Sequence, residues 1–360
     1  MRLSAHTRNV VMCAAVLSLL TGCGADHGTG GTVERVAERP ASWTDLPVRT
    51  GARDVVHTGT DDRSYKVRIT VKSLVRGSED DMRGARVDEG LKGTVPYYLT
   101  FEVTNTGPET IPAAYMVYSK LSLNGTDWTH GEKIILSGGR ADGADRPCAD
   151  TAPETLAPGD SYETCVAYAF PEGVGVLSLT HSADGYLDEG GAVATWPVEG
   201  GLKAASAGLA EPGESVRVRW RDIEDGVLEL PATPVSVRRG RPADLKGLDL
   251  DLNENERRGV PYYVSVTYTN PGPKDLYARQ ADDVRLLTEG GRQIRGKTPF
   301  GLDAKKVPGC PTDWITQMVA PGESVTECSI HLVTGDDKPF AVGFMEADRP
   351  GLVAWRAPFS

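Results

Sequence analysis

The chain has 360 residues, of which 39% are hydrophobic and 25% charged, a composition typical of globular proteins and sufficient for two hydrophobic cores. Its formal net charge of −11 argues against binding to nucleic acid and against electrostatic attraction to anionic lipid, because both favour basic surfaces. Solubility is the simplest explanation of this acidity.

The first 22 residues have the pattern of an export signal. Arg2 and Arg8 give a basic start, and the apolar run that follows is too short to span a bilayer as a helix. The run ends in Leu-Thr-Gly-Cys at 20–23, which resembles the lipobox of bacterial lipoproteins. This resemblance implies cleavage before Cys23 and acylation of that residue. The alternative is a plain secretory signal that is cut elsewhere.

Cleavage at this point would place the protein on the outer face of the cell membrane, held there by its lipid alone. The signal contains two arginines and no acidic residue, so its loss takes the net charge from −11 to −13. Residues 23–53 are rich in Gly, Thr, Ala, Glu, Arg and Pro without periodicity, and we predict a disordered tether. Trp43 and Leu46 are its sizeable apolar residues, and we expect them to be solvated rather than docked on a domain.

One stretch of the chain occurs twice. Val-Pro-Tyr-Tyr leads into Thr-Asn-Thr-Gly-Pro over 95–108, and a closely similar stretch returns 165 residues later over 260–273. Leu-Ala-Pro-Gly-Asp-Ser at 156–161 likewise matches Val-Ala-Pro-Gly-Glu-Ser at 319–324. This period is too long for a solenoid unit and indicates a whole domain that was copied once.

The repeated stretch predicts a half-buried strand. Tyr97, Leu99, Phe101 and Val103 alternate with more polar neighbours, which is typical of antiparallel sheets with one face on a core. About seven to nine such short strands per repeat, separated by turn signals, predict a β-sandwich. We therefore predict an all-β fold with almost no helix, in two domains at 54–200 and 215–360 that a linker at 201–214 connects.

Each repeat also resembles the immunoglobulin-like domains of secreted and lipid-anchored actinobacterial and firmicute proteins. In those domains an alternating strand ends in Thr-Asn-x-Gly, and an apolar-x-Pro-Gly-Glu/Asp-Ser turn follows later. The corresponding motifs lie at 101–107 with 156–161, and at 266–272 with 319–324. The resemblance implies two tandem immunoglobulin-like sandwiches and carries over no catalytic residue. The Cys…Trp…Cys spacing of antibody domains is missing, so their inter-sheet disulfide is not implied.

Four cysteines remain beyond the signal and Cys23, and they form one pair per repeat. In an oxidising compartment this number predicts two disulfides, for which three pairings are possible. The duplication favours a bridge within each repeat, Cys148–Cys165 and Cys310–Cys328. A metal or redox site is the alternative, but neither Cys-x-x-Cys spacing nor a nearby histidine supports it.

The sequence contains no recognisable catalytic pattern, and we expect neither an enzyme nor a cofactor. A Gly-x-Ser-x-Gly elbow, a phosphate-binding glycine loop and a dinucleotide fingerprint are all missing. The histidines beyond the signal are scattered, which gives no hint of a metal site or of a histidine-activated nucleophile: His27, His57, His130, His181 and His331. A triad that assembles only in space is the remaining enzymatic alternative.

Two further features have both a functional and a structural interpretation. Asp249, Asp251 and Asn253 imitate the start of an EF-hand, but Glu254 replaces the glycine that such a calcium loop needs. A solvated acidic loop is therefore the default for 249–256. Tyr98 and Tyr263 fall on the outer faces of their strands, where they could either join a partner interface or pack within the domain.

These observations predict a non-catalytic cell-surface lipoprotein that presents two β-sandwich modules to an envelope protein or ligand. The sequence does not identify that partner. The alternative is a small-ligand or calcium-binding lipoprotein that uses the acidic loop at 249–256. Contact with the membrane is expected through the lipid anchor only, and no contact with nucleic acid is expected.

Overall fold

The protein is described by a computed structural model, which covers 42–82, 91–134, 148, 152–182, 193–222, 226–246, 248, 250, 252–253, 256–278, 280–297, 307, 310, 317–347 and 352–360. Most of this part of the chain is β-strand in antiparallel sheets, which confirms the predicted all-β fold. The predicted signal and Cys23 lie outside the described residues. No described helix is long and apolar enough to cross a membrane.

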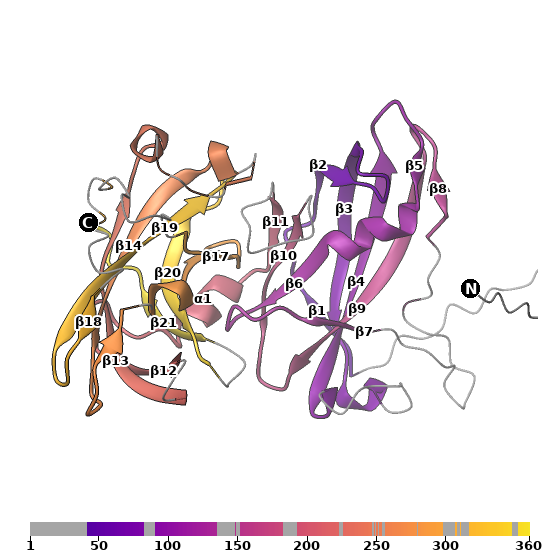
Figure 1. Ribbon diagram of the computed structural model, residues 1–360. Helices are drawn as coiled ribbons and strands as arrows, with labels where there is room; N and C mark the ends of the chain where they lie inside the picture. The colour runs from indigo at the N-terminus through magenta and orange to yellow at the C-terminus, as the bar shows by residue number, and fades with distance from the viewer. Residues whose placement is uncertain are drawn as a thin grey trace, which may run out of the picture. The chain divides into compact units, whose positions relative to one another are not determined.

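The described residues of the N-terminal repeat form eleven strands. Their bounds are β1 (Thr44–Leu46), β2 (Gly51–Thr58), β3 (Ser64–Arg76), β4 (Thr94–Asn105), β5 (Ile111–Pro112), β6 (Leu121–Gly125), β7 (Glu132–Ile134), β8 (Thr155–Leu156), β9 (Ser161–Pro171), β10 (Val176–Ser182) and β11 (Val193–Pro197). One large sheet has the order β1-β3-β4-β9-β7, with β2 also paired to β3, and a second sheet has the order β11-β10-β6 (Figure 1). Strands β5 and β8 form a small third sheet.

The C-terminal repeat has a similar plan. Its strands are β12 (Val216–Asp222), β13 (Gly226–Arg239), β14 (Val260–Thr269), β15 (Leu276–Tyr277), β16 (Val284–Thr288), β17 (Gln293–Arg295), β18 (Met318–Val319), β19 (Ser324–Val333), β20 (Pro339–Met345) and β21 (Leu352–Arg356). The sheet orders are β12-β13-β14-β19, β17-β16-β20-β21 and β15-β18. The two plans differ in that β17 pairs with β16, whereas β7 pairs with β9. No sheet among the described residues mixes strands of the two repeats, so the sheets follow the duplication seen in the sequence.

Helix is confined to short pieces in the described residues. The α-helix α1 (Gly201–Ser206) lies between the repeats, within the predicted linker. The remaining pieces are short 3₁₀ helices at Glu79–Met82, Ala114–Lys120, Pro242–Leu245, Glu256–Arg258 and Gln280–Asp283.

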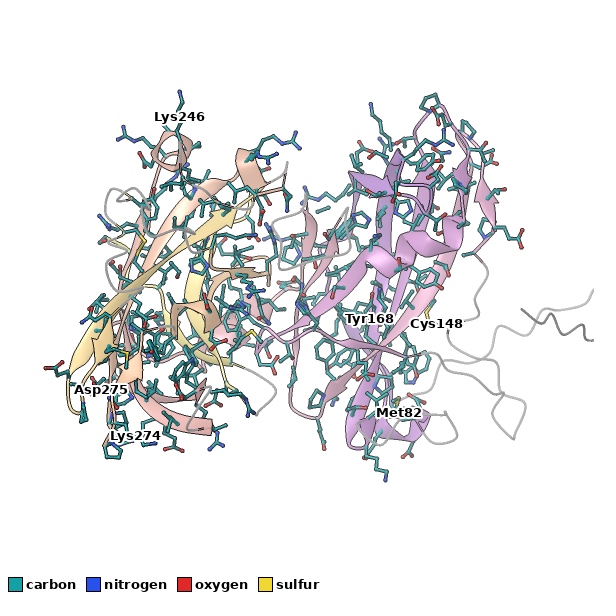
Figure 2. All side chains as sticks on the ribbon, viewed as in Figure 1. Met82, Cys148, Tyr168, Lys246, Lys274 and Asp275 are labelled. Carbon is teal, nitrogen blue, oxygen red and sulfur yellow. A yellow bond between two sulfur atoms is a disulfide. The ribbon has the colours of Figure 1, made fainter. Side chains whose placement is uncertain are left out.

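The repeated strand is an inner strand in both repeats: β4 lies between β3 and β9, and β14 lies between β13 and β19. In β4, Tyr97, Leu99, Phe101 and Val103 enter the main hydrophobic core, as their alternation predicts. This core also takes side chains from the smaller sheet, including Trp196, so side chains fill the space between the two sheets (Figure 2). A second core of the same kind lies in the C-terminal repeat.

The outer faces of the repeated strands are covered as well. Tyr98 is 3% exposed because Trp43 stacks on its ring, with a centroid distance of 4.8 Å. Tyr263 is also 3% exposed, and it lies in a cluster that contains Cys310 and Cys328. Neither tyrosine is available to a partner, so the packing interpretation holds for both.

The N-terminal repeat begins earlier than the sequence predicted. Strands β1 and β2 lie partly or wholly within 23–53, which was expected to be disordered up to its end. The indole of Trp43 donates a hydrogen bond to Asp81 over 2.8 Å, and Leu46 packs against the core. Both strands pair along β3, and most of their side chains face solvent, so their composition imitates that of a linker.

Each repeat has its own disulfide, Cys148–Cys165 in the first and Cys310–Cys328 in the second. In each bridge the second cysteine lies on a strand, Cys165 on β9 and Cys328 on β19, and these two strands occupy equivalent places in the repeats. The first cysteine lies outside the named strands. This is the pairing that the duplication favoured.

A buried asparagine ties together the two motifs that recur in each repeat. The side-chain amide of Asn105 donates to the carbonyl oxygens of Glu109 and Leu156, over 2.7 and 2.9 Å, and accepts from the backbone N–H of Gly107. Its backbone N–H donates to Asp160, and its carbonyl accepts from Gly159. The end of one strand is thereby fixed to the Pro-Gly turn that leads into the next. Asn270 repeats the same side-chain bonds with Lys274, Val319 and Gly272.

The Asn105→Ala substitution should lower the free energy of unfolding by about 2 to 3 kcal/mol, because it leaves one buried carbonyl and two partly buried backbone groups without their partner. Asn105→Asp keeps the size of the side chain but places carboxylate oxygens against carbonyl oxygens, so it should be at least as harmful at pH 7. Urea unfolding monitored by circular dichroism measures both. The neighbouring exposed Thr106→Ala is the control, and equal losses for Thr106→Ala and Asn105→Ala would contradict the assigned role.

Candidate functional site

The two repeats meet through a small apolar core, which we call the junction. Residues 39–360 form one compact unit. Trp128 and Leu177 of the N-terminal repeat pack with Ala205 of α1 and with Leu287 and Ala341 of the C-terminal repeat, and all five are at most 4% exposed. The predicted linker is therefore partly helical, and it is packed into the junction.

Polar contacts fix the junction in one arrangement. The hydroxyl of Ser178 on β10 donates to the carbonyl of Gly290 in the β16–β17 turn. The indole N–H of Trp128 donates to the carbonyl of Thr288, and the amide of Gln293 donates to the carbonyl of Trp128. Because buried polar groups are costly to leave unpaired, these bonds favour one register over its neighbours.

Gly291 is required where the turn approaches the N-terminal repeat. Its φ is +84°, and a Cβ atom built there would lie 2.7 Å from Oγ of Ser178 and 3.0 Å from Cβ of Asn124. Both of these neighbours are fully buried. A side chain at this position would therefore push the repeats apart.

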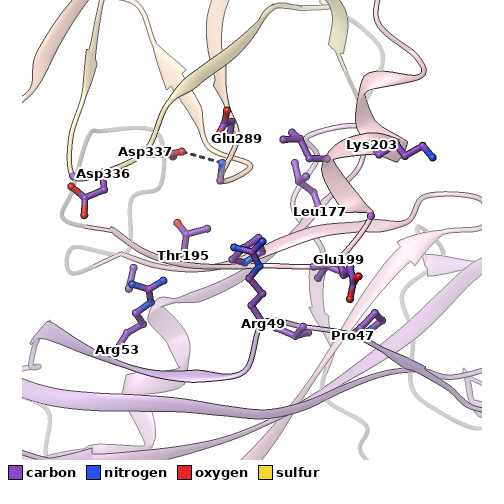
Figure 3. Close-up of a pocket in the computed structure, with 18 of the residues that line it drawn as sticks. Pro47, Arg49, Arg53, Leu177, Thr195, Glu199, Lys203, Glu289, Asp336 and Asp337 are labelled. Atoms are coloured by element: carbon purple, nitrogen blue, oxygen red, sulfur yellow. Dashed lines mark hydrogen bonds between the residues drawn. The ribbon is translucent and has the colours of Figure 1, made fainter.

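A cleft of about 870 Å³ lies beside the junction and is lined by both repeats. Figure 3 shows Arg49 and Arg53 on one side of it and Glu289, Asp336 and Asp337 on the other. Its remaining lining residues include small and apolar groups together with Thr195, Glu199 and Lys203. Several charged side chains therefore line this cleft.

Both walls of the cleft are held in place by hydrogen bonds. On the first, the backbone N–H of Arg49 donates to the carbonyl of Pro197 over 3.1 Å, and the indole of Trp196 donates to the carbonyl of Gly51 over 2.8 Å. On the second, Oδ1 of Asp337 accepts from the backbone N–H groups of Gly290 and Lys338, over 3.0 and 2.9 Å. The loops that present the charged side chains are thus tied to the sheets and to each other.

The charges that face the cleft are not neutralised locally. Within the described residues, the side chains of Arg49, Arg53, Glu289 and Asp336 form no ion pair or hydrogen bond, and all four are exposed. Unlike these, Asp54 at the cleft margin is paired with Arg68 over 2.8 Å, and this contact lowers the pKa of its carboxyl. The arginine side of the cleft also carries the exposed carboxylate of Glu199, which Arg49 and Arg53 outnumber. The cleft therefore has a predominantly positive wall and a negative wall.

The most perturbed titratable groups lie in the cores and not in the cleft. Burial raises the pKa of Glu327 to about 8, and its Oε2 accepts a hydrogen bond from the backbone N–H of Ala281. Burial lowers the pKa of His57 to about 4, of His181 to about 3 and of His331 to about 4. Strongly shifted groups often mark catalytic sites, but none of these four lines the cleft.

The acidic loop is only partly described. Asp249, Asp251 and Glu254 lie outside the described residues, so the structure does not place them. The side-chain oxygen of Asn253 accepts from the backbone N–H of Glu256, whose carboxylate accepts in return from the N–H of Asn253 and pairs with Lys297 over 3.0 Å. Asn253 thus caps a 3₁₀ turn, and the described residues contain no cluster of three or more metal-ligating side chains.

Sequence reasoning missed the cleft entirely. Arg49 and Arg53 lie in the stretch assigned to the tether, and Glu289 and Asp336 lie in ordinary turn sequences. None of them belongs to a motif, because strand β2 and two turns that are distant from it in sequence line the cleft together. Comparisons of the chain with protein-family models, with curated proteins and with solved structures gave no match.

Gly291→Ala should destabilise the protein more than Gly322→Ala does, by about 1 to 2 kcal/mol. Gly322 is the matched control, because its φ of +79° imposes similar backbone strain while a Cβ there would meet nothing within 4 Å. The difference therefore isolates the collision at the junction. Thermal unfolding measures it, and equal losses in the two variants would show that the repeats do not depend on this close approach.

Glu327→Gln should stabilise the protein above about pH 5. Folded Glu327 holds its proton up to about pH 8, whereas the unfolded chain releases it near the ordinary value of 4.5. Folding must therefore take up a proton between these values, and the stability of the native protein falls as pH rises. Gln removes this cost, so its advantage should reach about 3 kcal/mol at pH 7 and vanish below pH 4.5.

Urea unfolding at several pH values tests this dependence on Glu327. The exposed Glu323→Gln is the matched control, since it removes a carboxyl just before the same strand. A pH-independent effect of Glu327→Gln would contradict the predicted proton uptake.

Proposed function

We propose that the protein is a non-catalytic lipoprotein on the outer face of the cell membrane, whose two immunoglobulin-like β-sandwich domains bind an envelope protein or ligand in the cleft between them. The observation that carries this proposal is a cleft with unneutralised charges on both walls, built jointly by two repeats that a buried junction holds together. A site that needs both repeats gives a reason for their fixed arrangement.

Other features of the chain support the location and the absence of chemistry. The lipobox-like Leu-Thr-Gly-Cys at 20–23 supports anchoring through Cys23. Two disulfides are typical of proteins that fold in an oxidising, extracytoplasmic compartment. The cleft contains charged side chains suited to recognition, while the groups with the most perturbed pKa values are buried elsewhere.

Site-specific photocrosslinking in cells that express the full-length protein tests the binding role. A photoreactive residue in place of Thr195, which lines the cleft, should give a defined crosslinked product. The same residue in place of the exposed Arg217 on β12, which does not line the cleft, is the control. Arg53→Glu should reduce the yield of the crosslink formed from position 195 severalfold, because this substitution reverses a charge on the cleft wall.

The same cells test the anchor. Cys23→Ser should move the protein out of the membrane fraction, because it removes the sulfur that carries the lipid. Products from Thr195 no stronger than those from Arg217, or products insensitive to Arg53→Glu, would count against binding in the cleft. Unchanged membrane retention of Cys23→Ser would count against the lipid anchor.

A further inference from the structure

The two walls of the cleft carry opposite charges that do not meet. Arg49 and Arg53 belong to the N-terminal repeat, and Glu289 and Asp336 belong to the C-terminal repeat (Figure 3). No pair among them lies within ion-pair distance in the described structure. Such an arrangement sets up an electric field across the cleft, and the low-dielectric walls of a cleft concentrate such a field.

The walls are not free to collapse onto one another. The junction fixes the repeats through the Ser178–Gly290 bond and the close approach at Gly291. The loop of Asp336 is tied to the β16–β17 turn through Asp337. The separation of the charges is therefore built into the fold, and a ligand can gain from both walls at once without paying to open the cleft.

From this geometry we propose that the cleft binds a dipolar ligand, which carries an ammonium group that faces Glu289 and Asp336 and an oxyanion that faces Arg49 and Arg53. Guanidinium groups suit carboxylate and phosphate oxygens, and carboxylates accept from an ammonium group. A short peptide with free termini has this chemistry. The inference rests on the proposed binding role and names the class of ligand for it.

A purely anionic ligand fits less well, because two acidic side chains would face its remote end. A purely cationic ligand meets the same objection at the arginine wall. The overall charge of −11 also disfavours attraction of anions from a distance, so the local arginines act at short range only.

The test uses the full-length protein in a neutral maltoside detergent and isothermal titration calorimetry at low salt. Four forms of tetra-alanine serve as probes: the free zwitterion, the N-acetylated anion, the C-amidated cation and the doubly blocked neutral peptide. Extended, this peptide spans about 13 Å. Di-alanine provides a shorter span, and O-phosphoethanolamine provides a phosphate in place of the carboxylate.

The zwitterionic probe should bind at least about fivefold tighter than either singly blocked form, since blocking removes one ionic contact. Its affinity should fall as salt is raised. Tighter binding of the peptide identifies the oxyanion as a carboxylate, and tighter binding of phosphoethanolamine identifies it as a phosphate. Either result supports the proposal. Equal affinity for the free and blocked peptides, or tighter binding of the N-acetylated or amidated form, overturns it.

Charge reversal gives an independent readout. Two double variants should each lower the affinity for the zwitterionic peptide by about tenfold: Arg49→Glu/Arg53→Glu and Glu289→Arg/Asp336→Arg. The fourfold variant exchanges the walls and should restore binding, with the peptide reversed. Weakening by both pairs excludes recognition of a single charge, for which one pair would strengthen binding and the other would weaken it. Arg217→Glu is the control, and unfolding midpoints show that each variant is folded.

The outcome is separable from that of the proposed function. If cleft crosslinks persist in cells while no dipolar probe binds, the ligand class is wrong and the binding role stands. If the probes bind with the expected charge dependence while cells give no crosslink, the ligand class stands and the envelope partner is wrong.

Discussion

The architecture of each repeat depends on one buried side-chain amide. Asn105 and Asn270 are 1% and 2% exposed, and each saturates its amide with two carbonyls and one backbone N–H. An amide in such a site would be strongly unfavourable if any partner were missing. The asparagine therefore forces the Thr-Asn-x-Gly and Pro-Gly motifs to lie together, which accounts for the recurrence of both motifs at matching places in the two repeats.

The junction uses the parts of the repeats that differ in sequence. The β6–β7 turn and the β16–β17 turn are equivalent in the two halves, and they meet each other. Trp128 and Gln293 hold corresponding positions, 165 residues apart. Their roles differ, because the side-chain amide of Gln293 donates a hydrogen bond to the backbone carbonyl of Trp128. At the same offset Gly291 corresponds to Thr126, so the two turns are complementary where their sequences differ. The cleft is a consequence of that docking.

Sequence could predict the features that local chemistry determines. Alternation at Tyr97 to Val103 predicted the core face of β4, and one cysteine pair per repeat favoured the observed disulfides. Prediction from sequence failed where the structure of a segment depends on the strands and turns that pack against it. Strands β1 and β2 have linker-like composition, because only one edge pairs and few side chains are buried. Arg53 and Asp336 carry no local signal, since their proximity to one cleft depends on contacts between sequence-distant turns.

The distribution of charge and burial is the physical basis of the proposed binding role. Glu327 has the pKa expected of a general acid or base, but it sits in the core with its carboxyl held by Ala281. His331 has both ring nitrogens bonded, to Ser329 and to the carbonyl of Ile294, and so packs as part of the interior. The cleft instead contains exposed arginine and acidic side chains on strand β2 and on the turns around it. Such groups contribute little to folding stability. Their arrangement on two opposed walls therefore makes sense as a means of orienting a charged molecule between the repeats.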